Sequence, residues 1–278
     1  MTRSRQLVLY TVLAYALSWS IWIPGILSMN GDYQFAELGF VSYLATFGPS
    51  IAALLVVALT KGWLGVRALL ARLLRWRFGW RPYLVIWFVT PLVFLLGLML
   101  FGLRPVADAL PFLLLQVVLL MPLNALLSGF LGAGPLGEEL GWRGFMLPRL
   151  LEMFGDLGSS VILGLVWTFW HLPLFVFVDW RVGVATAPFI LLYPVTLIAL
   201  SFAMTKLYHW TKGSVFAAIL MHGAVNFSTA QLIDPEAFVF GSRSSLQVYL
   251  TAVGAFLLLA AVFWLLDKRL LKRPHTPE

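Results

Sequence analysis

The sequence predicts an all-α polytopic membrane protein with about eight transmembrane helices and one amphipathic helix at the membrane surface. The chain of 278 residues is 61% hydrophobic and 11% charged, whereas an average soluble domain is about half apolar and about a quarter charged. Apolar runs of about 20 residues recur, which is the length that crosses a bilayer core as a helix. The loops between these runs alternate in charge, as the positive-inside rule requires when both termini are cytoplasmic.

The expected spans form a single membrane domain, residues 1–278. Their approximate bounds are 6–29, 40–59, 82–103, 109–130, 157–178, 187–207, 214–232 and 246–266. The net charge of +7 is explained by cations at the span ends, so we expect membrane lipids and no nucleic acid as partners. There is no cysteine, which excludes disulfides and thiolate chemistry. If the source is prokaryotic, we expect a multi-pass protein of the cytoplasmic membrane.

The segment 61–81 lies between the second and third spans and is basic rather than uniformly apolar. On a helical wheel, Arg67, Arg72 and Arg75 lie on one side, and the large apolar side chains lie on the other. This pattern is typical of an amphipathic helix in the headgroup plane whose arginines face anionic lipid. We therefore expect 61–81 to be an interfacial helix that anchors the topology.

Residues 109–232 are the expected catalytic core. A Gly-Ala-Gly-Pro sequence interrupts the fourth span, and its last residue, Pro135, suits the first turn of a new helix. That helix carries the pattern Glu138-Glu139-x-x-x-Arg143, and Pro148 is expected to kink it. An ionisable group at the centre of a membrane helix costs roughly 2.5–3.5 kcal/mol, so three of them within six residues indicate a function.

Helical geometry gives the two glutamates different roles. Glu139 and Arg143 are four residues apart and share a helix face, so they can form an ion pair. Glu138 points about 100° away from Glu139. We therefore predict Glu138 as a candidate general base, and Glu139 with Arg143 as structural support.

Two further patterns follow on later spans. The fifth span contains Trp167-Thr-Phe-Trp-His171, and the seventh contains His222-Gly-Ala-Val-Asn226. A histidine and an amide on one helix face can bind a metal, hold a water or donate to a developing oxyanion. Taken alone, each polar group is more often an interhelical hydrogen-bonding residue. Their combination with Glu138 in so apolar a chain favours a site.

The three patterns, in this order, resemble those of the CPBP family of intramembrane proteases, which includes the type II CAAX prenyl endopeptidases. The resemblance covers about residues 135–226, and its most specific part runs from Gly137 to Phe145. The second element of the family usually begins with Phe, and Trp167 takes that place here. The resemblance implies an intramembrane endopeptidase that acts on membrane-associated peptides or lipidated proteins.

The resemblance also implies residue roles. Glu138 would activate the hydrolytic water with help from His171, His222 and Asn226 would bind the oxyanion, and Glu139, Arg143 and Trp167 would support them. The family is often described as metalloendopeptidase-like, and Glu138, His171 and His222 are candidate zinc ligands. A glutamate-activated water with imidazole and amide donors needs no metal. We predict no obligatory metal, with zinc as the alternative.

Two other functions are compatible with the same residues. One is a non-catalytic immunity or scaffold protein that binds a peptide, and the other is a proton-coupled transporter that uses Glu138 and the histidines as a relay. The depth of Glu138 is also open, because His171 is expected about 20 Å into the fifth span. Either the helix that begins at Pro135 turns back into the bundle, or the span boundaries shift by a turn or two.

Overall fold

A computed structural model describes residues 1–28, 39–100, 115, 119–132, 134–177, 187–232 and 245–270. Within these ranges the regular secondary structure is helical and contains no strand, which confirms the all-α prediction. The elements of the first half are α1 (Arg3–Ser28), α2 (Gly39–Ala45), α3 (Gly48–Leu70), η2 (Ala71–Leu74), α4 (Trp80–Leu84), η3 (Val85–Val89), α5 (Thr90–Leu100) and α7 (Met121–Phe130). Those of the second half are α8 (Pro135–Glu139), η6 (Leu140–Met146), α9 (Leu147–Trp170), α10 (Leu172–Phe177), α11 (Ala187–Trp210), α12 (Val215–Leu232) and α13 (Ser245–Leu270).

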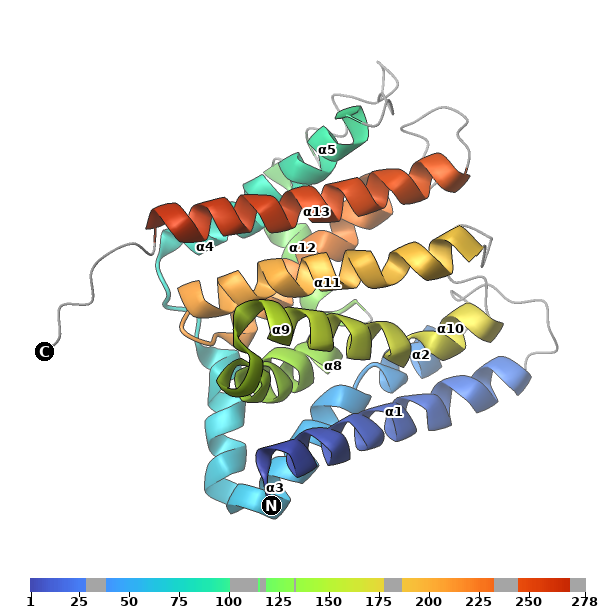
Figure 1. The fold of residues 1–278 in the computed structure, drawn as a ribbon, viewed down its shortest axis with the longest axis vertical. Helices are drawn as coiled ribbons and strands as arrows, with labels where there is room; N and C mark the ends of the chain where they lie inside the picture. The colour runs from blue at the N-terminus through green and yellow to red at the C-terminus, as the bar shows by residue number, and fades with distance from the viewer. Residues whose placement is uncertain are drawn as a thin grey trace, which may run out of the picture.

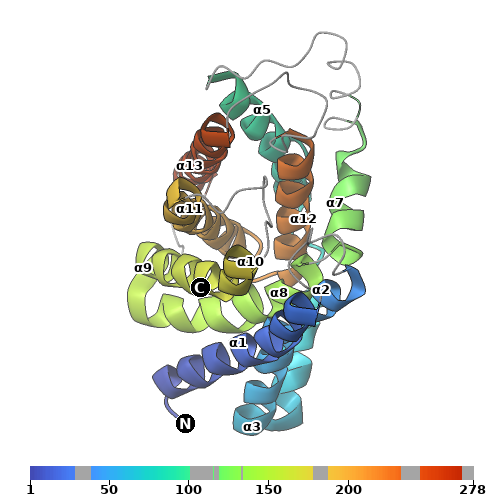
Figure 2. The same ribbon diagram turned by 90° about the vertical axis from the view of Figure 1, so that its right-hand side faces the viewer.

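The long helices pack side by side in a bundle. Helices α9, α11 and α13 form one row, and α7 and α12 form a second (Figures 1 and 2). Helix α1 packs on α3 and closes the bundle next to α9. Helix α5 lies between the two rows at the opposite edge, where it contacts both α12 and α13. The motif helix, which starts with α8, therefore lies among α1, α3, α7 and α12.

Several helices are long and apolar enough to cross a membrane. The long stretches are Arg3–Gly25, Tyr43–Leu74, Pro135–Trp170 and Leu191–Trp210, and the shorter ones are Trp80–Leu96, Val215–Thr229 and Leu250–Leu266. Many large side chains that face outward are apolar, including Leu59 and Leu191, which suits contact with lipid rather than water. The protein is therefore an integral membrane protein. The first part of the expected span 109–130 lies mostly outside the described residues, and the number of spans stays a prediction.

The stretch Pro135–Trp170 is not one straight helix. At Gly155 the backbone has φ 63° and ψ −173°, a conformation that is essentially restricted to glycine. The chain turns there, so the helix that begins at Pro135 and the second part of α9 run side by side as a hairpin (Figure 1). The kink that the sequence placed at Pro148 lies at Gly155 instead, because Pro148 begins α9 within its first turn, where a missing N–H is tolerated.

The expected interfacial helix 61–81 is shorter than predicted. The backbone leaves helical geometry at Gly62 (φ 62°) and again after Leu74, so the helical part covers residues 63–74. This part crosses the ends of the long helices, on the side where the N-terminus lies (Figure 1). Its apolar side, with Val66 and Leu69 buried, faces the protein. Arg72 is only half-exposed and also bonds inward, contrary to its predicted outward position.

Candidate active site

The motif helix packs closely against α1 and the start of α3. A Cβ on Gly141 would lie 2.5 Å from the carbonyl oxygen of Pro49 and 2.6 Å from the phenol oxygen of Tyr10. Glycine is required for such close contact between helices. From Leu140 to Met146 the helix is π-helical, a form that is frequent at functional sites. The backbone that carries the two glutamates is therefore held in place by its neighbours.

The hairpin at Gly155 brings two motifs to the same depth. Glu138 lies 17 residues before Gly155 and His171 lies 16 residues after it, so both are about 25 Å from the turn at 1.5 Å per residue. Their elements meet, since Trp167 of α9 contacts Glu138 of α8. The sequence left two explanations for the depth of Glu138. The structure shows the first of them: the helix that begins at Pro135 turns back into the bundle.

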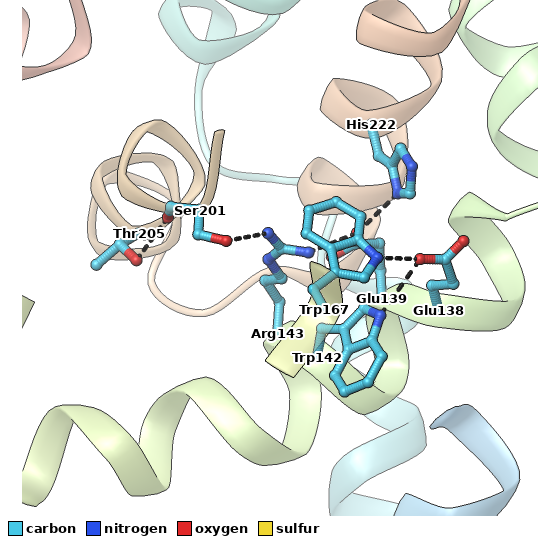
Figure 3. Close-up of polar contacts among 8 residues, drawn as sticks. All are labelled: Glu138, Glu139, Trp142, Arg143, Trp167, Ser201, Thr205 and His222. Atoms are coloured by element: carbon cyan, nitrogen blue, oxygen red, sulfur yellow. Dashed lines mark hydrogen bonds and ion pairs between the residues drawn. The ribbon is translucent and has the colours of Figure 1, made fainter. Parts of the chain in front are cut away.

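Glu138 is buried, with 3% of its surface exposed. Its Oε2 atom accepts hydrogen bonds from the indole N–H groups of Trp167, at 2.6 Å, and of Trp142, at 3.3 Å (Figure 3). Trp142 lies four residues later on the motif helix, so it shares the helix face of Glu138. Both donors converge on one carboxylate oxygen, and neither indole uses the other oxygen, Oε1.

The Oε1 atom of Glu138 lies on the side of Gly134 and Asn226. A Cβ on Gly134 would be 2.8 Å from Glu138 Oε1 and 3.8 Å from Asn226 Nδ2. The carboxylate oxygen and the amide nitrogen are therefore close to the same point in space. Glycine at position 134 leaves this point free of a side chain. A water and a substrate carbonyl that approach Glu138 Oε1 and Asn226 Nδ2 beside Gly134 would meet one acceptor and one donor.

Glu139 forms the centre of a buried ionic cluster. Its Oε1 atom accepts from Arg143 Nη1 at 2.9 Å and from His222 Nδ1 at 2.8 Å (Figure 3). The side chains of Glu139 and Arg143 are both fully buried. Arg143 Nη2 also approaches the hydroxyl of Ser201 on α11, at 3.4 Å. The ion pair expected from the i,i+4 spacing is present, and it also orients His222.

Trp167 contacts both the Glu138 site and the ionic cluster. The guanidinium of Arg143 lies 4.4 Å from the centre of the Trp167 ring, within the range of a cation–π interaction. The His222 ring packs edge-on against the same indole, with centroids 5.1 Å apart. Trp167 therefore separates Glu138 from Arg143 while it contacts the side chains on each side.

His171 ends the second part of α9 and is 6% exposed. Its Nδ1 atom lies 2.8 Å from the carbonyl oxygen of Trp167. The imidazole packs edge-on against Trp170, with centroids 4.7 Å apart, and against Tyr193 of α11, with centroids 5.6 Å apart. These contacts fix the ring on the side of Trp167 that faces α11.

The partners of the two histidines determine which ring nitrogen carries the proton. A carboxylate oxygen and a carbonyl oxygen only accept hydrogen bonds, so Nδ1 of His222 and Nδ1 of His171 must both be donors. In the neutral ring, the proton is then on Nδ1, and Nε2 is an acceptor. His222 can donate to an oxyanion from Nε2 only as an imidazolium, whereas the Asn226 amide is a donor in every state.

The predicted zinc ligands do not form a recognisable metal site. Among the described residues, no group of three or more His, Cys, Asp or Glu side chains is arranged to hold a metal ion. Each of the three side chains has one potential ligand atom bonded elsewhere: Glu138 Oε2 accepts from two indoles, and Nδ1 of each histidine is bonded to an oxygen. The arrangement of Glu138, His171 and His222 therefore does not fit the tetrahedral zinc alternative, and no step below is routed through a metal.

The structure brings the sequence-predicted residues into one cluster around Trp167. Its members are Glu138, Glu139, Arg143, Trp167, His171, His222 and Asn226. The sequence prediction did not include Trp142, Tyr193 and Ser201. The i,i+4 spacing from Glu138 could have identified Trp142, but no local signal points to the two residues on α11.

The fold and site define an α-helical integral membrane protein with buried glutamate and histidine side chains at a helical hairpin. Residues 117–228 match the sequence model of a family described as Type II CAAX prenyl endopeptidase Rce1-like. A curated relative, CAAX prenyl protease 2 of Methanococcus maripaludis, is 23% identical over 137 residues, which are 48% of this chain and 46% of the relative. The alignment thus spans about half of either protein. These matches confirm the resemblance to the CPBP family.

Proposed function

We propose that this protein is a CAAX-type intramembrane endopeptidase that hydrolyses peptide bonds of membrane-associated or lipidated substrates. The observation that carries the proposal is the geometry of Glu138, which is buried, held through one oxygen by two indole N–H groups, and turned through the other towards Gly134 and Asn226. A fixed carboxylate beside an amide donor is what water-mediated amide hydrolysis requires. The family match supports the same reaction class.

In the proposed reaction, Glu138 Oε1 accepts a proton from a water molecule as the water oxygen adds to the scissile carbonyl carbon. The carbonyl oxygen becomes an oxyanion, and Asn226 Nδ2 donates to it. When the tetrahedral intermediate collapses, the C–N bond breaks and the leaving nitrogen takes the proton that Glu138 received. His171 assists the proton transfer, and Glu139 and Arg143 hold the neighbouring helices in place.

His222 has a conditional role in this scheme. Its Nδ1–H is directed to Glu139, so it can be the second oxyanion donor only when Nε2 is also protonated. The family name and the relative's name support a prenylated protein C-terminus as the substrate class. The buried position of the site in an integral membrane protein is compatible with a lipidated chain, and also with other membrane-associated peptides.

The test uses the purified full chain in phosphatidylcholine liposomes, with a prenylated peptide ending in Cys-a-a-X as the probe. Mass spectrometry measures release of the C-terminal fragment. We expect cleavage by the wild type and by Glu152→Gln, a matched control at an exposed glutamate, and no cleavage by Glu138→Gln. Cleavage by Glu138→Gln at the wild-type rate would contradict the proposed mechanism. Cleavage of the unprenylated peptide at the same rate would contradict the lipidated substrate class.

A further inference from the structure

The segment 61–81, called the surface segment below, has a strong positive charge that no residue within it balances. It contains Lys61 and five arginines, and no Asp or Glu. Its helical part crosses the ends of the long helices instead of running parallel to them (Figure 1). A helix in this position lies in the plane of a membrane surface when the bundle spans the bilayer.

Two of the arginines hold the surface segment against the bundle. Arg72 Nη1 donates to the carbonyl oxygen of Gly144 on the motif helix, at 3.0 Å, and lies 3.4 Å from the phenol oxygen of Tyr208 on α11. Arg75 Nη1 donates to the carbonyl oxygen of Lys212, at 3.0 Å. The hydroxyl of Ser214, at the start of α12, donates to the carbonyl oxygen of Arg75. The backbone of the segment is therefore fixed to three other elements.

The other three arginines are exposed. Arg67 lies on the outer face of the helical part, and Arg77 and Arg81 follow it. The guanidinium groups of Arg77 and Arg81 lie over their neighbouring tryptophan rings, Trp76 and Trp80, at 4.7 Å and 5.7 Å from the ring centres. These cations are presented on a fixed backbone, so they need little ordering to bind an anion.

Exposed tryptophans accompany the exposed arginines. Trp63 is 68% exposed, Trp76 53% and Trp80 66%. Tryptophan is enriched at the headgroup level of membranes because its ring is apolar and its N–H is polar. The surface segment therefore combines cations with interfacial aromatic rings, which is the composition that binds a lipid surface rather than a protein surface or a free anion.

We propose that the surface segment binds the phosphate headgroups of anionic phospholipids, with Arg67, Arg77 and Arg81 as the contact residues. Trp63, Trp76 and Trp80 lie at the boundary between the headgroups and the acyl chains. Because Arg72 and Arg75 fix the segment to the motif helix, α11 and α12, lipid bound there stabilises the folded bundle. This inference does not depend on the proposed peptidase activity.

The test measures the melting temperature of the purified full chain in mild detergent while phosphatidylglycerol, phosphatidylcholine or inorganic phosphate is added. We expect phosphatidylglycerol to raise the melting temperature and the other two additions to leave it unchanged. In the triple variant Arg67→Gln/Arg77→Gln/Arg81→Gln, the half-maximal concentration of phosphatidylglycerol should rise about 100-fold, since each cation near an anionic surface contributes about fivefold in affinity. High salt should weaken the wild-type response.

The matched control removes three cations at the same end of the bundle but outside the surface segment: Arg3→Gln, Arg5→Gln and Lys212→Gln. This variant should shift the half-maximal concentration of phosphatidylglycerol less than the surface-segment variant does, because Arg3 is already paired with Glu152. The proposal would be overturned if the half-maximal concentration of phosphatidylglycerol rose equally in both triple variants. It would also be overturned if phosphatidylcholine or phosphate raised the melting temperature of the wild type as much as phosphatidylglycerol does. If the Arg67, Arg77 and Arg81 triple variant has a lower melting temperature than the wild type before lipid is added, the single variant Arg77→Gln is used in its place. Its half-maximal concentration of phosphatidylglycerol should rise about fivefold.

Discussion

The indole nitrogen of Trp167 lies 2.6 Å from Glu138 Oε2, so the first residue of the second motif donates a hydrogen bond to the first glutamate of the first motif. The CPBP pattern usually has Phe at the position of Trp167, and Phe has no N–H to donate. From the sequence alone, the replacement only exchanges one aromatic side chain for another. The structure shows that it also adds a polar contact to the carboxylate that we propose as the general base.

The contribution of this contact can be measured with Trp167→Phe, which keeps an aromatic ring beside Arg143 and His222 and removes the N–H. A hydrogen bond to a charged group contributes about 1.5–3 kcal/mol, and Trp142 remains as a second donor, so we expect cleavage to slow about tenfold. The rate of peptide cleavage in liposomes measures the effect. Trp264→Phe, at an exposed tryptophan of α13, is the control and should be neutral. A wild-type rate in Trp167→Phe would show that Trp142 alone holds Glu138.

The buried ion pair between Glu139 and Arg143 predicts a strongly non-additive pair of substitutions. Arg143→Met leaves the Glu139 carboxylate buried without its cation and should lower the free energy of unfolding by about 3–5 kcal/mol. The double variant Glu139→Gln/Arg143→Met removes both charges and should recover part of that loss. Unfolding in mixed micelles measures both.

The control for this pair is Arg3→Met, which breaks an exposed ion pair with Glu152 and should cost less than about 1 kcal/mol. The single variant Glu139→Gln completes the comparison. If its loss and the loss in Arg143→Met simply added in the double variant, the two charges would not be coupled. That result would contradict the contact seen in the structure.

Gly155 predicts an effect on both stability and activity, since it forms the turn of the hairpin. Alanine at a φ of 63° and a ψ of −173° is strained by about 1–3 kcal/mol. A Cβ there would meet no atom within 4 Å, so any loss in Gly155→Ala comes from the backbone and not from a clash. We expect a lower melting temperature and slower cleavage, because the turn sets the alignment of Trp167 with Glu138. An unchanged melting temperature would contradict a glycine-specific turn.

Much of the site could be predicted from sequence because its residues are paired at helical spacing. Glu139 with Arg143, and His222 with Asn226, share helix faces whatever the tertiary structure. Their combination across helices was also predictable, since a chain this apolar carries few ionisable groups without a use for them. The contact between Glu139 and His222 was not predictable, because it depends on how α8 and α12 pack.

The hairpin shows why the depth of Glu138 could not be decided from sequence. Proline is the expected helix breaker, so the sequence predicts the kink at Pro148. The turn instead depends on Gly155, whose positive φ leaves no trace in a hydropathy profile. Similarly, the wheel for 61–81 assumed one unbroken α-helix. Residues 71–74 are instead a tighter 3-10 turn, which changes the direction of Arg72 relative to Arg67, and Arg72 bonds inward.

Arg72 links the surface segment to the motif helix through the carbonyl oxygen of Gly144. Arg72 Nη1 donates to this carbonyl at 3.0 Å. The bond is charge-assisted, and such a bond contributes about 1.5–3 kcal/mol. Arg72→Leu removes the donor and should lower the free energy of unfolding by about that amount.

Unfolding of the wild type, Arg72→Leu and Arg72→Lys in mixed micelles measures this contribution. Arg72→Lys keeps a cationic donor near the Gly144 carbonyl and should lose less stability than Arg72→Leu. Arg5→Leu, at an exposed arginine, is the control and should change the free energy of unfolding little, because surface substitutions usually do. Equal losses in Arg72→Leu and Arg5→Leu would contradict a stabilising contact between Arg72 and the motif helix.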